Sequence, residues 1–511
     1  MWLIDHQMNV KVGDEFGMYF ARIPLTSSPH VVHGNALYID WTSVLPPEQC
    51  SFVMGNPPFV GAKFMSDEQR LDVARVFGGM DNAGLLDFVC AWYVLATKYL
   101  KAPSPGQREG WDGGRTVEKT RCAFVSTNSI TQGEQVGVLW GWLLAQGIKI
   151  HFAHRTFAWS NEARGKAAVH CVIIGFGLSD VPNKTIFEYD DIRGDPHALI
   201  VNNINPYLVD APSVVLPRRS SPICSVPEIG IGNKPIDDGN YLFTGDEKDA
   251  FIKREPHAKK YFRRWLGAVE FINNIERWCL WLGNCTPGEL RPMPEVMKRV
   301  QAVKTFRLAS ISAPTRKLAE TPTRFHVENM PTTPYLVIPE VSSEKRQFVP
   351  IGYMQPETLS SNLVKIAVGA ELFHFGVLTS TMHNAWIRFT CGRMKSDYRY
   401  SKDIVYNNFP WPENPTETQK QKVEGAAQTV LDVRAEFPES SLADLYDPLT
   451  MPPMLVKAHQ KLDAAVDAAY GKKSFKNDAE RVAFLFELYQ KYTSLLPSES
   501  AKPKRRIAKK A

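Results

Sequence analysis

Residues 51–59, Ser-Phe-Val-Met-Gly-Asn-Pro-Pro-Phe, decide the fold because they place a stiff polar turn directly after a short apolar run. The run 51–54 has the length and composition of a buried strand. Pro57 and Pro58 lack N–H groups and have fixed φ angles, so the strand must end and the chain leaves it extended. This junction is typical of the carboxyl edge of an open α/β sheet, where ligands bind.

The turn Asn56-Pro57-Pro58-Phe59 offers hydrogen-bond acceptors beside a flat ring. The Asn56 side-chain oxygen and the Pro57 carbonyl can both accept from one exocyclic amino group, and Phe59 can stack on a planar base. Such a site suits an amine-bearing nucleobase that has been drawn out of its stack. The alternative is a purely structural turn, since Asn-Pro is a common turn dipeptide.

Strand-like and helix-like segments alternate on both sides of this turn. The sequence predicts helices over 84–100 and 133–147, a loop over 102–118, and strands over 121–126, 148–153 and 167–176. Strands that alternate with helices indicate an α/β sheet with crossover connections. The close spacing of the strands after residue 148 indicates that an antiparallel hairpin is added to this sheet.

Because 511 residues are too many for one core, several domains are expected. A proline-rich stretch near residues 203–233 and a change to Trp- and Arg-rich composition mark one boundary. Helical periodicity over 416–436 and 454–495 marks another. The predicted regions are 1–205, the α/β domain; 206–233, a linker; 234–412, an α+β domain; 413–497, a helical domain; and 498–511, a basic disordered tail.

The formal net charge of +6 is unevenly distributed. Residues 215–412 carry a net +8, the regions 1–214 and 413–500 carry −4 each, and the last eleven residues carry +6. A basic region between acidic flanks indicates a polyanionic partner, with scattered solvated charge as the alternative.

Composition excludes several classes of protein. No stretch of about 18 apolar residues is present that would cross a bilayer, and the first residues do not have the pattern of a secretory signal. The eight cysteines form no C-x-x-C pair, and the histidines show no metal-ligand spacing. We therefore expect a reducing, cytoplasmic compartment, no bound metal and no membrane association.

The turn after the apolar run resembles motif IV of DNA methyltransferases that modify amino groups, mainly the N6-adenine kind. Other stretches are similar to MmeI-like enzymes, the single-chain type IIL restriction–modification enzymes of prokaryotes. These stretches are 33–37, 123–135 (AFVSTNSITQGEQ), 151–176, 397–401 and 405–412. The resemblance covers nearly the whole chain.

The resemblance implies a partial Rossmann-like class I methyltransferase domain, followed by an α+β target-recognition domain and a C-terminal helical module. It implies methyl transfer from S-adenosyl-L-methionine to adenine N6 in double-stranded DNA, within a restriction–modification system. The implied residues are Asn56, Pro57, Pro58 and Phe59 for catalysis; Asn35, Asp87 and Phe88 for the cofactor; and Phe157 or Trp159 for stacking on the target base. The last five can also be ordinary turn, helix or core residues.

The sequence departs from the family pattern before residue 56. The glycine-rich loop that binds the cofactor in the family is absent there, and the only G-x-G, Gly230-Ile231-Gly232, lies in the predicted linker. The family's amino-terminal nuclease is absent as well. We therefore expect a site-specific methyltransferase that is cut off inside its methyltransferase domain, with an upstream polypeptide as a candidate source of the missing cofactor motif. The alternatives are a catalytically inert DNA-binding fragment and one chain of a split methyltransferase.

Two basic clusters in the central region are candidates for DNA contact. The first cluster holds Lys259, Lys260, Arg263 and Arg264. These side chains are expected to contact DNA phosphates; the alternative is a solvated helix face. The second cluster holds Arg393, Lys395, Asp397 and Arg399. On an extended segment, Asp397 and Arg399 point to the same side, where arginine can read guanine and aspartate can accept from cytosine. A surface ion pair is the alternative.

Overall fold

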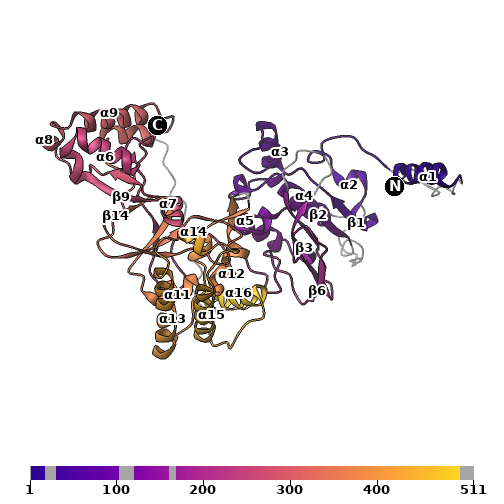
Figure 1. Ribbon diagram of the computed structural model, residues 1–511. Coiled ribbons are helices and arrows are strands. Elements are labelled where there is room, and N and C mark those ends of the chain that lie inside the picture. The colour runs from indigo at the N-terminus through magenta and orange to yellow at the C-terminus, as the bar shows by residue number, and fades with distance from the viewer. Residues whose placement is uncertain (1, 18–29, 103–119, 160–168, 395, 495–511) are drawn as a thin grey trace.

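The computed structural model describes residues 2–17, 30–102, 120–159, 169–394 and 396–494. Figure 1 shows a sheet with its helices on one side of the molecule, the segments after residue 206 on the other, and helix α5 at the junction. The N-terminal helix α1 stands apart from the sheet in this view. The predicted basic tail lies outside the described residues.

The first part contains a six-stranded mixed sheet in the order β1-β2-β4-β3-β5-β6. The strands are β1 Phe52–Gly55, β2 Arg121–Thr127, β3 Lys149–Trp159, β4 Val169–Gly177, β5 Lys184–Glu188 and β6 His197–Val201. β1 and β2 are parallel, whereas β4 is antiparallel to both β2 and β3. The carboxyl ends of β1, β2 and β3 therefore lie at one edge, and the predicted α/β fold with an antiparallel addition is confirmed.

The described helices of this part are α1 Trp2–Phe16, which stands apart, and four that accompany the sheet: α2 Trp41–Val44, α3 Asp67–Phe77, α4 Cys90–Leu100 and α5 Gly133–Ala145. The buried Tyr93 ring of α4 stacks 5.2 Å from Phe176 and meets Phe124 edge-on at 5.3 Å, which joins the helix to β2 and β4. The helix expected from residue 84 begins only at Cys90. The reason is a short 3₁₀ turn, Ala83–Leu85, followed by Leu86 in an extended conformation.

β1 is an edge strand, and among the described residues it pairs only with β2. The side chains of Phe52 and Met54 are 65% and 78% exposed. This exposure contradicts the expectation that residues 51–54 form a buried strand. Both side chains are apolar and the strand is open on one side, so this edge presents apolar surface that a further segment could cover.

Residues 229–399 contribute three small sheets. Their orders are β13-β11-β15-β7, β14-β9-β10-β8 and β12-β17-β16. The strands are β7 Ile229–Ile231, β8 Leu242–Phe243, β9 Phe262–Leu266, β10 Trp278–Leu280, β11 Tyr335–Pro339, β12 Val341–Ser342, β13 Gly352–Met354, β14 Thr358–Ser360, β15 Val364–Val368, β16 Gly392–Met394 and β17 Asp397–Arg399. The predicted α+β character of this region is therefore present.

Helices of the same region divide into two groups. The outer lobe in Figure 1 holds α6, α8 and α9, whereas α11 and α12 lie beside the C-terminal helices. The bounds are α6 Gly245–Arg254, α7 Ala268–Asn273, α8 Pro287–Leu290, α9 Pro294–Leu308, α10 Ala313–Lys317, α11 Leu372–Thr379 and α12 Thr381–Thr390. The outer lobe has an aromatic core of its own, which includes Phe243, Phe262 and Trp281.

The segment predicted as a linker is extended but packed. Tyr207 is buried and its ring stacks 5.0 Å from Phe486 in the last helix. Gly230 lies in β7, and a Cβ atom at Gly232 would overlap the carbonyl oxygens of Ser360 and Ser361. Gly232 thus allows the backbone after β7 to approach the end of β14 in a neighbouring sheet, as glycine does wherever two backbones approach closely.

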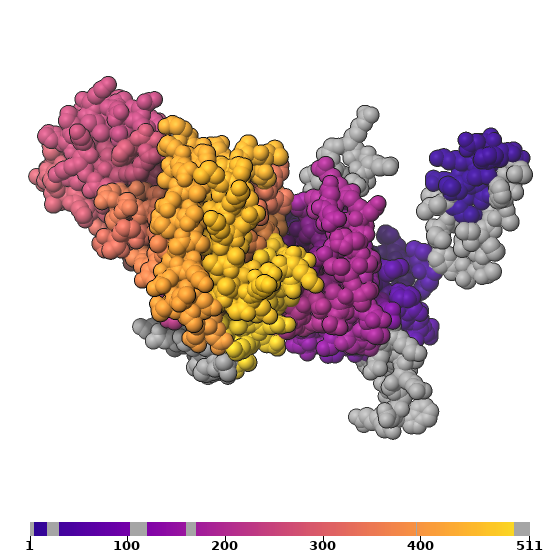
Figure 2. All heavy atoms as spheres, turned by 60° about the horizontal axis from the view of Figure 1, so that its bottom comes forward, coloured from indigo at the N-terminus to yellow at the C-terminus, as the bar shows by residue number. Residues whose placement is uncertain are grey.

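The C-terminal region is helical, as predicted: α13 Glu417–Ala435, α14 Leu442–Leu445, α15 Pro453–Ala469 and α16 Asp478–Ser494. The helix expected over 454–495 is divided because Gly471 adopts a left-handed conformation with φ +73°. Asp463 of α15 accepts hydrogen bonds from the Thr381 N–H at 2.7 Å and its hydroxyl at 2.6 Å, which ties α15 to the start of α12. In Figure 2 these helices lie between the outer lobe and the sheet.

Candidate functional site

The turn Asn56-Pro57-Pro58-Phe59 follows β1 at the carboxyl edge of the sheet. Asn56 is exposed, Pro57 is buried and Phe59 is half-buried. A Cβ atom at Gly55 would lie 3.4 Å from the Phe124 ring, so glycine lets that ring pack beneath the end of the strand. Within the described part of the chain, the Asn56 side chain has no hydrogen-bond partner, which leaves its oxygen available to a ligand.

Asp87 ties this turn to the loop that follows β2. One carboxylate oxygen accepts from the Ala62 N–H at 2.8 Å, and the other accepts from the Ser129 hydroxyl at 2.6 Å. The Asp87 N–H donates to the Gln135 side chain at 3.1 Å, and the next N–H, of Phe88, donates to Val60 at 2.9 Å. Asp87 and Phe88 are both buried, and their hydrogen bonds hold the segment that follows the Asn56 turn.

The loop after β2 contains polar residues to which the sequence analysis gave no role. The Asn128 side-chain nitrogen and the Gln132 side-chain oxygen are buried without a partner among the described residues. Unsatisfied buried groups are rare and costly, so both atoms are candidates for a ligand contact. The sequence did contain a signal for this loop: Thr-Asn-Ser at 127–129 ends a second apolar strand, as Asn56 ends the first.

Phe157 and Trp159 reach the same edge of the sheet. The register places Thr127 of β2 opposite Cys171 of β4, and Cys171 opposite Phe157 of β3. The Phe157 ring is 5.5 Å from Tyr189 in a stacked arrangement and 6.2 Å from Trp159. Trp159 is 36% exposed, so it retains ring surface for another group.

His154 precedes these two aromatic residues on β3 and belongs to the same cluster. Its ring stacks 4.2 Å from Phe187, and its Nδ1 atom lies 2.8 Å from the Tyr189 hydroxyl. Burial lowers the pKa of His154, because an apolar surrounding disfavours the charged ring. We conclude that His154 orients Tyr189, the residue on which Phe157 stacks.

Asn35 lies in the turn before α2. Its side-chain oxygen accepts from the Leu37 N–H at 2.9 Å, and its side-chain nitrogen donates to Asp72 at 3.2 Å. The first contact closes a local turn of the kind that asparagine favours. The second carboxylate oxygen of Asp72 is buried without a partner among the described residues, which marks an unfilled acceptor beside Asn35.

The second basic cluster lies on the hairpin β16–β17, where exposure alternates as expected. Tyr398 is buried, Asp397 is half-buried and Arg399 is exposed. The Arg393 side chain is only 15% exposed; it donates to Glu344 and to the Ser396 carbonyl, both at 2.7 Å. Arg393 therefore braces the hairpin, and Arg399 is the more accessible arginine. Lys395 lies outside the described residues.

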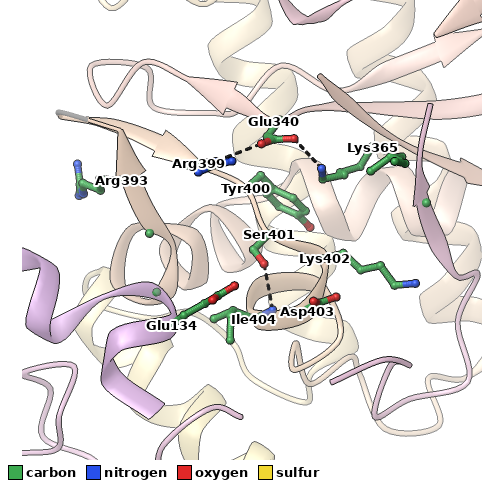
Figure 3. Close-up of a pocket in the computed structure, with 14 residues that line it drawn as sticks. Glu134, Glu340, Lys365, Arg393, Arg399, Tyr400, Ser401, Lys402, Asp403 and Ile404 are labelled. Atoms are coloured by element: carbon green, nitrogen blue, oxygen red, sulfur yellow. Dashed lines mark hydrogen bonds and ion pairs between the residues drawn. The ribbon is translucent and has the colours of Figure 1, made fainter. Parts of the chain in front are cut away.

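Glu340 lies between Arg399 and Lys365 and pairs with both (Figure 3). The Glu340 carboxylate lies 2.7 Å from the Lys365 ammonium and 3.1 Å from Nε of Arg399. Burial disfavours the charged form of Glu340, but these two cations outweigh burial and lower the pKa of its carboxyl group. Because Glu340 engages Nε, the two terminal amino groups of Arg399 remain available for a paired contact.

The first basic cluster lies on the outer lobe. Lys259 and Lys260 belong to the 3₁₀ segment Pro256–Tyr261, and Arg263 and Arg264 belong to β9, so this cluster is not a helix face. Lys260 pairs with Glu289 at 2.5 Å, and Arg264 pairs with Glu276 at 3.3 Å. Lys259 is exposed and has no partner among the described residues, which leaves it the most available cation.

Within the described ranges, no group of three or more His, Cys, Asp or Glu side chains is arranged to hold a metal ion. No helix in those ranges is long and apolar enough to cross a membrane.

Three family models match the chain in succession. The model "MmeI, DNA-methyltransferase domain" matches residues 1–188, "MmeI, target recognition domain" matches 210–413, and "MmeI, C-terminal domain" matches 415–497. The first match contains the turn at Asn56, and the second contains both basic clusters.

Individual proteins give the same result. "DNA methyltransferase A" of Bacillus subtilis (strain 168) is 38% identical over 497 residues, which are 96% of this chain and 54% of that protein. The solved structure of the type IIL restriction–modification enzyme MmeI in complex with DNA matches with a TM-score of 0.83 and 53% identity. That match covers 97% of this chain and 64% of the MmeI chain. The chain thus spans about half the length of the curated relative.

The order of the three matched domains agrees with the order of the sheet, the central α+β region and the terminal helices. The turn Asn56-Pro57-Pro58-Phe59 lies at the carboxyl edge of the sheet, within the match to the methyltransferase domain. The chain therefore belongs to the MmeI-like family of type IIL restriction–modification proteins and carries the methyltransferase, target-recognition and C-terminal domains of that family.

Proposed function

We propose that this chain forms the adenine-binding and DNA-reading parts of a site-specific DNA methyltransferase, which transfers a methyl group from S-adenosyl-L-methionine to adenine N6. The observation that carries this proposal is the unpartnered Asn56 side chain, exposed on a proline-stiffened turn at the sheet edge. The substrate is double-stranded DNA within a restriction–modification system, and the setting is the prokaryotic cytoplasm.

The chemistry follows from the acceptors of the turn. Asn56 Oδ1 and the Pro57 carbonyl accept the two N–H groups of the adenine amine, and Phe59 stacks on the ring. Two acceptors localise the nitrogen lone pair and make the amine a better nucleophile. S-adenosylmethionine, when bound, supplies an electrophilic methyl group. The nitrogen releases its proton after it has become cationic, so these residues need no strong base beside them.

The cofactor side of the site is only partly supplied by the described residues. Membership of a methyltransferase family implies use of S-adenosylmethionine, yet the side chains of Asn35 and Asp87 already have internal hydrogen-bond partners. We propose that a further polypeptide segment completes this side by covering β1. The exposed side chains of Phe52 and Met54 on the open strand edge support this proposal.

The decisive experiment mixes the purified chain with labelled S-adenosylmethionine and duplex DNA, alone and with the polypeptide encoded immediately upstream. Methyl transfer only in the mixture is the expected result. Transfer by the chain alone would show that no further segment is needed. If neither preparation transfers a methyl group but both bind DNA, the chain is an inert DNA-binding module. The internal partners of Asn35 and Asp87 favour that second candidate function.

Arg399 is expected to read one base pair of the recognition site. Replacing Arg399 with alanine should relax the preference at that position by about 1–3 kcal/mol, because a paired contact to one base edge is lost. Selection of bound duplexes from a random library measures this change without requiring catalysis.

The control for Arg399 is Lys259→Ala on the outer lobe. Loss of one phosphate contact should weaken the affinity for all DNA sequences alike. It should also reduce the slope of log affinity against log salt concentration by about one. If Arg399→Ala keeps the sequence preference of the parent, Arg399 does not contact a base of the recognition site.

Trp159 is expected to stack on the flipped adenine. Phe157, which stacks on Tyr189, is expected to pack beside Trp159 and hold its ring in place. Replacing Trp159 with alanine should weaken the flipped state by about 1–3 kcal/mol, the usual value of stacking between a base and an aromatic ring. Methyl transfer at subsaturating DNA measures the loss, and Trp159→Phe should retain most of the activity. A larger loss in Phe157→Leu at an unchanged melting temperature would reverse the two roles.

A further inference from the structure

Two glycines from distant parts of the chain meet at the junction of the sheet and the reading hairpin. Gly133 begins α5 with φ +62°, and a Cβ atom there would lie 2.9 Å from Cα and 3.2 Å from N of Gly392. Gly392 is the first residue of β16. Figure 3 shows Glu134, at the start of α5, beside the strand that carries Arg393. A Cβ atom at Gly133 does not fit between the two backbones, so their close approach requires glycine at that position.

On the sheet side, Gly133 is joined to the catalytic turn through a short series of hydrogen bonds. Gln135, two residues into α5, accepts from the Asp87 N–H at 3.1 Å. The Asp87 carboxylate in turn accepts from the Ala62 N–H at 2.8 Å, three residues after Phe59. A displacement at the start of α5 is therefore transmitted to the turn that holds Asn56.

On the other side, Gly392 is fixed to the proposed base reader. In the hairpin register Gly392 lies opposite Arg399, and Arg393 lies opposite Tyr398. The N–H of the preceding residue, Cys391, donates to the Ile387 carbonyl at 3.0 Å and closes α12. Gly392 thus has little freedom to move without Arg399.

Ion pairs surround the same junction. Arg218 lies 3.6 Å from Glu134 of α5 and 2.8 Å from Asp403, which follows the hairpin. The junction also borders a cleft of about 450 Å³ that both glycines and Arg399 line. The ion pairs are partly exposed and weak, so the close backbone contact is the stronger of these two constraints at the junction.

We propose that the contact between Gly133 and Gly392 is a joint that fixes the distance between the catalytic turn and the reading hairpin. Both glycines are positioning residues. They determine how far the methylated adenine lies from the base that Arg399 reads. This role rests on the proposed function of the turn and the hairpin, but the joint itself can be tested without catalysis.

Four variants separate the contact from other effects. Gly133→Ala adds a Cβ atom that must displace the backbone of Gly392. Gly147→Ala is the matched control, since Gly147 lies just beyond the other end of α5 with φ +90° and open space around it. Gly392→Ala places its Cβ atom 3.7 Å from Gly133 Cα, an ordinary contact. Gly392→Val adds bulk to the joint without a left-handed φ.

The experiment measures the distance between spin labels at two exposed positions in the full chain, Glu68 of α3 and Lys345 beyond β12. The labels are attached to an encoded keto amino acid, which avoids the eight native cysteines. We expect the parent, Gly147→Ala and Gly392→Ala to share one distance distribution. Gly133→Ala and Gly392→Val should shift or broaden it.

The same proteins are then tested for DNA affinity and methyl transfer. Affinity depends mainly on phosphate contacts and should remain close to that of the parent, whereas methyl transfer should fall about 10²-fold in the two joint variants. The proposed joint is contradicted if Gly133→Ala has the same distance distribution as Gly147→Ala. It is also contradicted if the distance changes in Gly133→Ala while methyl transfer stays at the parent rate. If Gly133→Ala fails to fold, the distance distribution and methyl transfer of Gly392→Val test the proposed joint instead. If the parent protein transfers no methyl group, the proposed function is refuted. The comparison of spin-label distances between the variants still tests the proposed joint.

Discussion

Replacing Asn56 with alanine should lower the rate of methyl transfer by about 10²–10³-fold, the usual effect of removing one preorganised polar group that stabilises developing charge. The Asn56 oxygen is one of two acceptors that hold the adenine amine, and the Pro57 carbonyl cannot orient both N–H groups alone. The rate is measured with labelled S-adenosylmethionine at saturating DNA, in whichever preparation transfers the methyl group.

Folding should be unaffected by this substitution. Asn56 is exposed, and its side chain has no hydrogen-bond partner among the described residues, so the melting temperature should stay the same. Asn202→Ala is a suitable control, because Asn202 is exposed and follows β6 at the far end of the sheet order. If Asn56→Ala transfers methyl groups as fast as Asn202→Ala, the turn is structural and the catalytic assignment fails.

The second large effect is expected at Arg307, in the outer lobe. This side chain is 0% exposed and its guanidinium donates to five carbonyl oxygens at 2.8–3.1 Å. The five carbonyls belong to Pro235, Ile236, Leu318, Thr321 and Arg324. The guanidinium thus joins the start of the lobe to the segment that closes it. Burial lowers the pKa of Arg307, yet its many acceptors keep it charged.

Replacing Arg307 with methionine leaves these carbonyls buried without donors. The free energy of unfolding of the lobe should fall by about 3–5 kcal/mol, as when one partner of a buried charged network is removed. Thermal unfolding should then show an early transition, and DNA affinity should drop because Lys259 lies on this lobe. Arg316→Met is the control, since Arg316 is exposed and donates only to Ser310 and Ile311. Equal melting curves for the two variants would contradict the proposed role.

Much of the catalytic part could be predicted from the sequence. The period and length of the apolar runs predicted strands over 121–126 and 148–153 and a helix over 133–147, because these patterns depend on local geometry. The structure has these elements, with the second strand continuing to Trp159. The turn at Asn56 was found from the proline pair and the strand before it. The role of Asp87 was not predictable, since its partners Ala62 and Ser129 come from other segments.

In the recognition region, less of the candidate site could be predicted from the sequence than in the first part of the chain. Charge counting located the basic domain, and alternation placed Asp397 and Arg399 on one side of a strand, because a strand repeats every two residues. The sequence could not distinguish Arg393 from Arg399. Only the tertiary structure buries the first against Glu344 and leaves the second accessible in front of Glu340.

By itself, the sequence determined the class of fold, the order of the regions and the position of the proline-stiffened turn at Asn56, all of which follow from local patterns. The tertiary structure alone decided that β1 is an open edge, that the segment after residue 206 is packed, and that Gly133 touches Gly392. Each of these depends on which surfaces meet after the chain has folded. Contacts between residues far apart in the chain leave no periodic signal in the sequence, so only the folded molecule shows them.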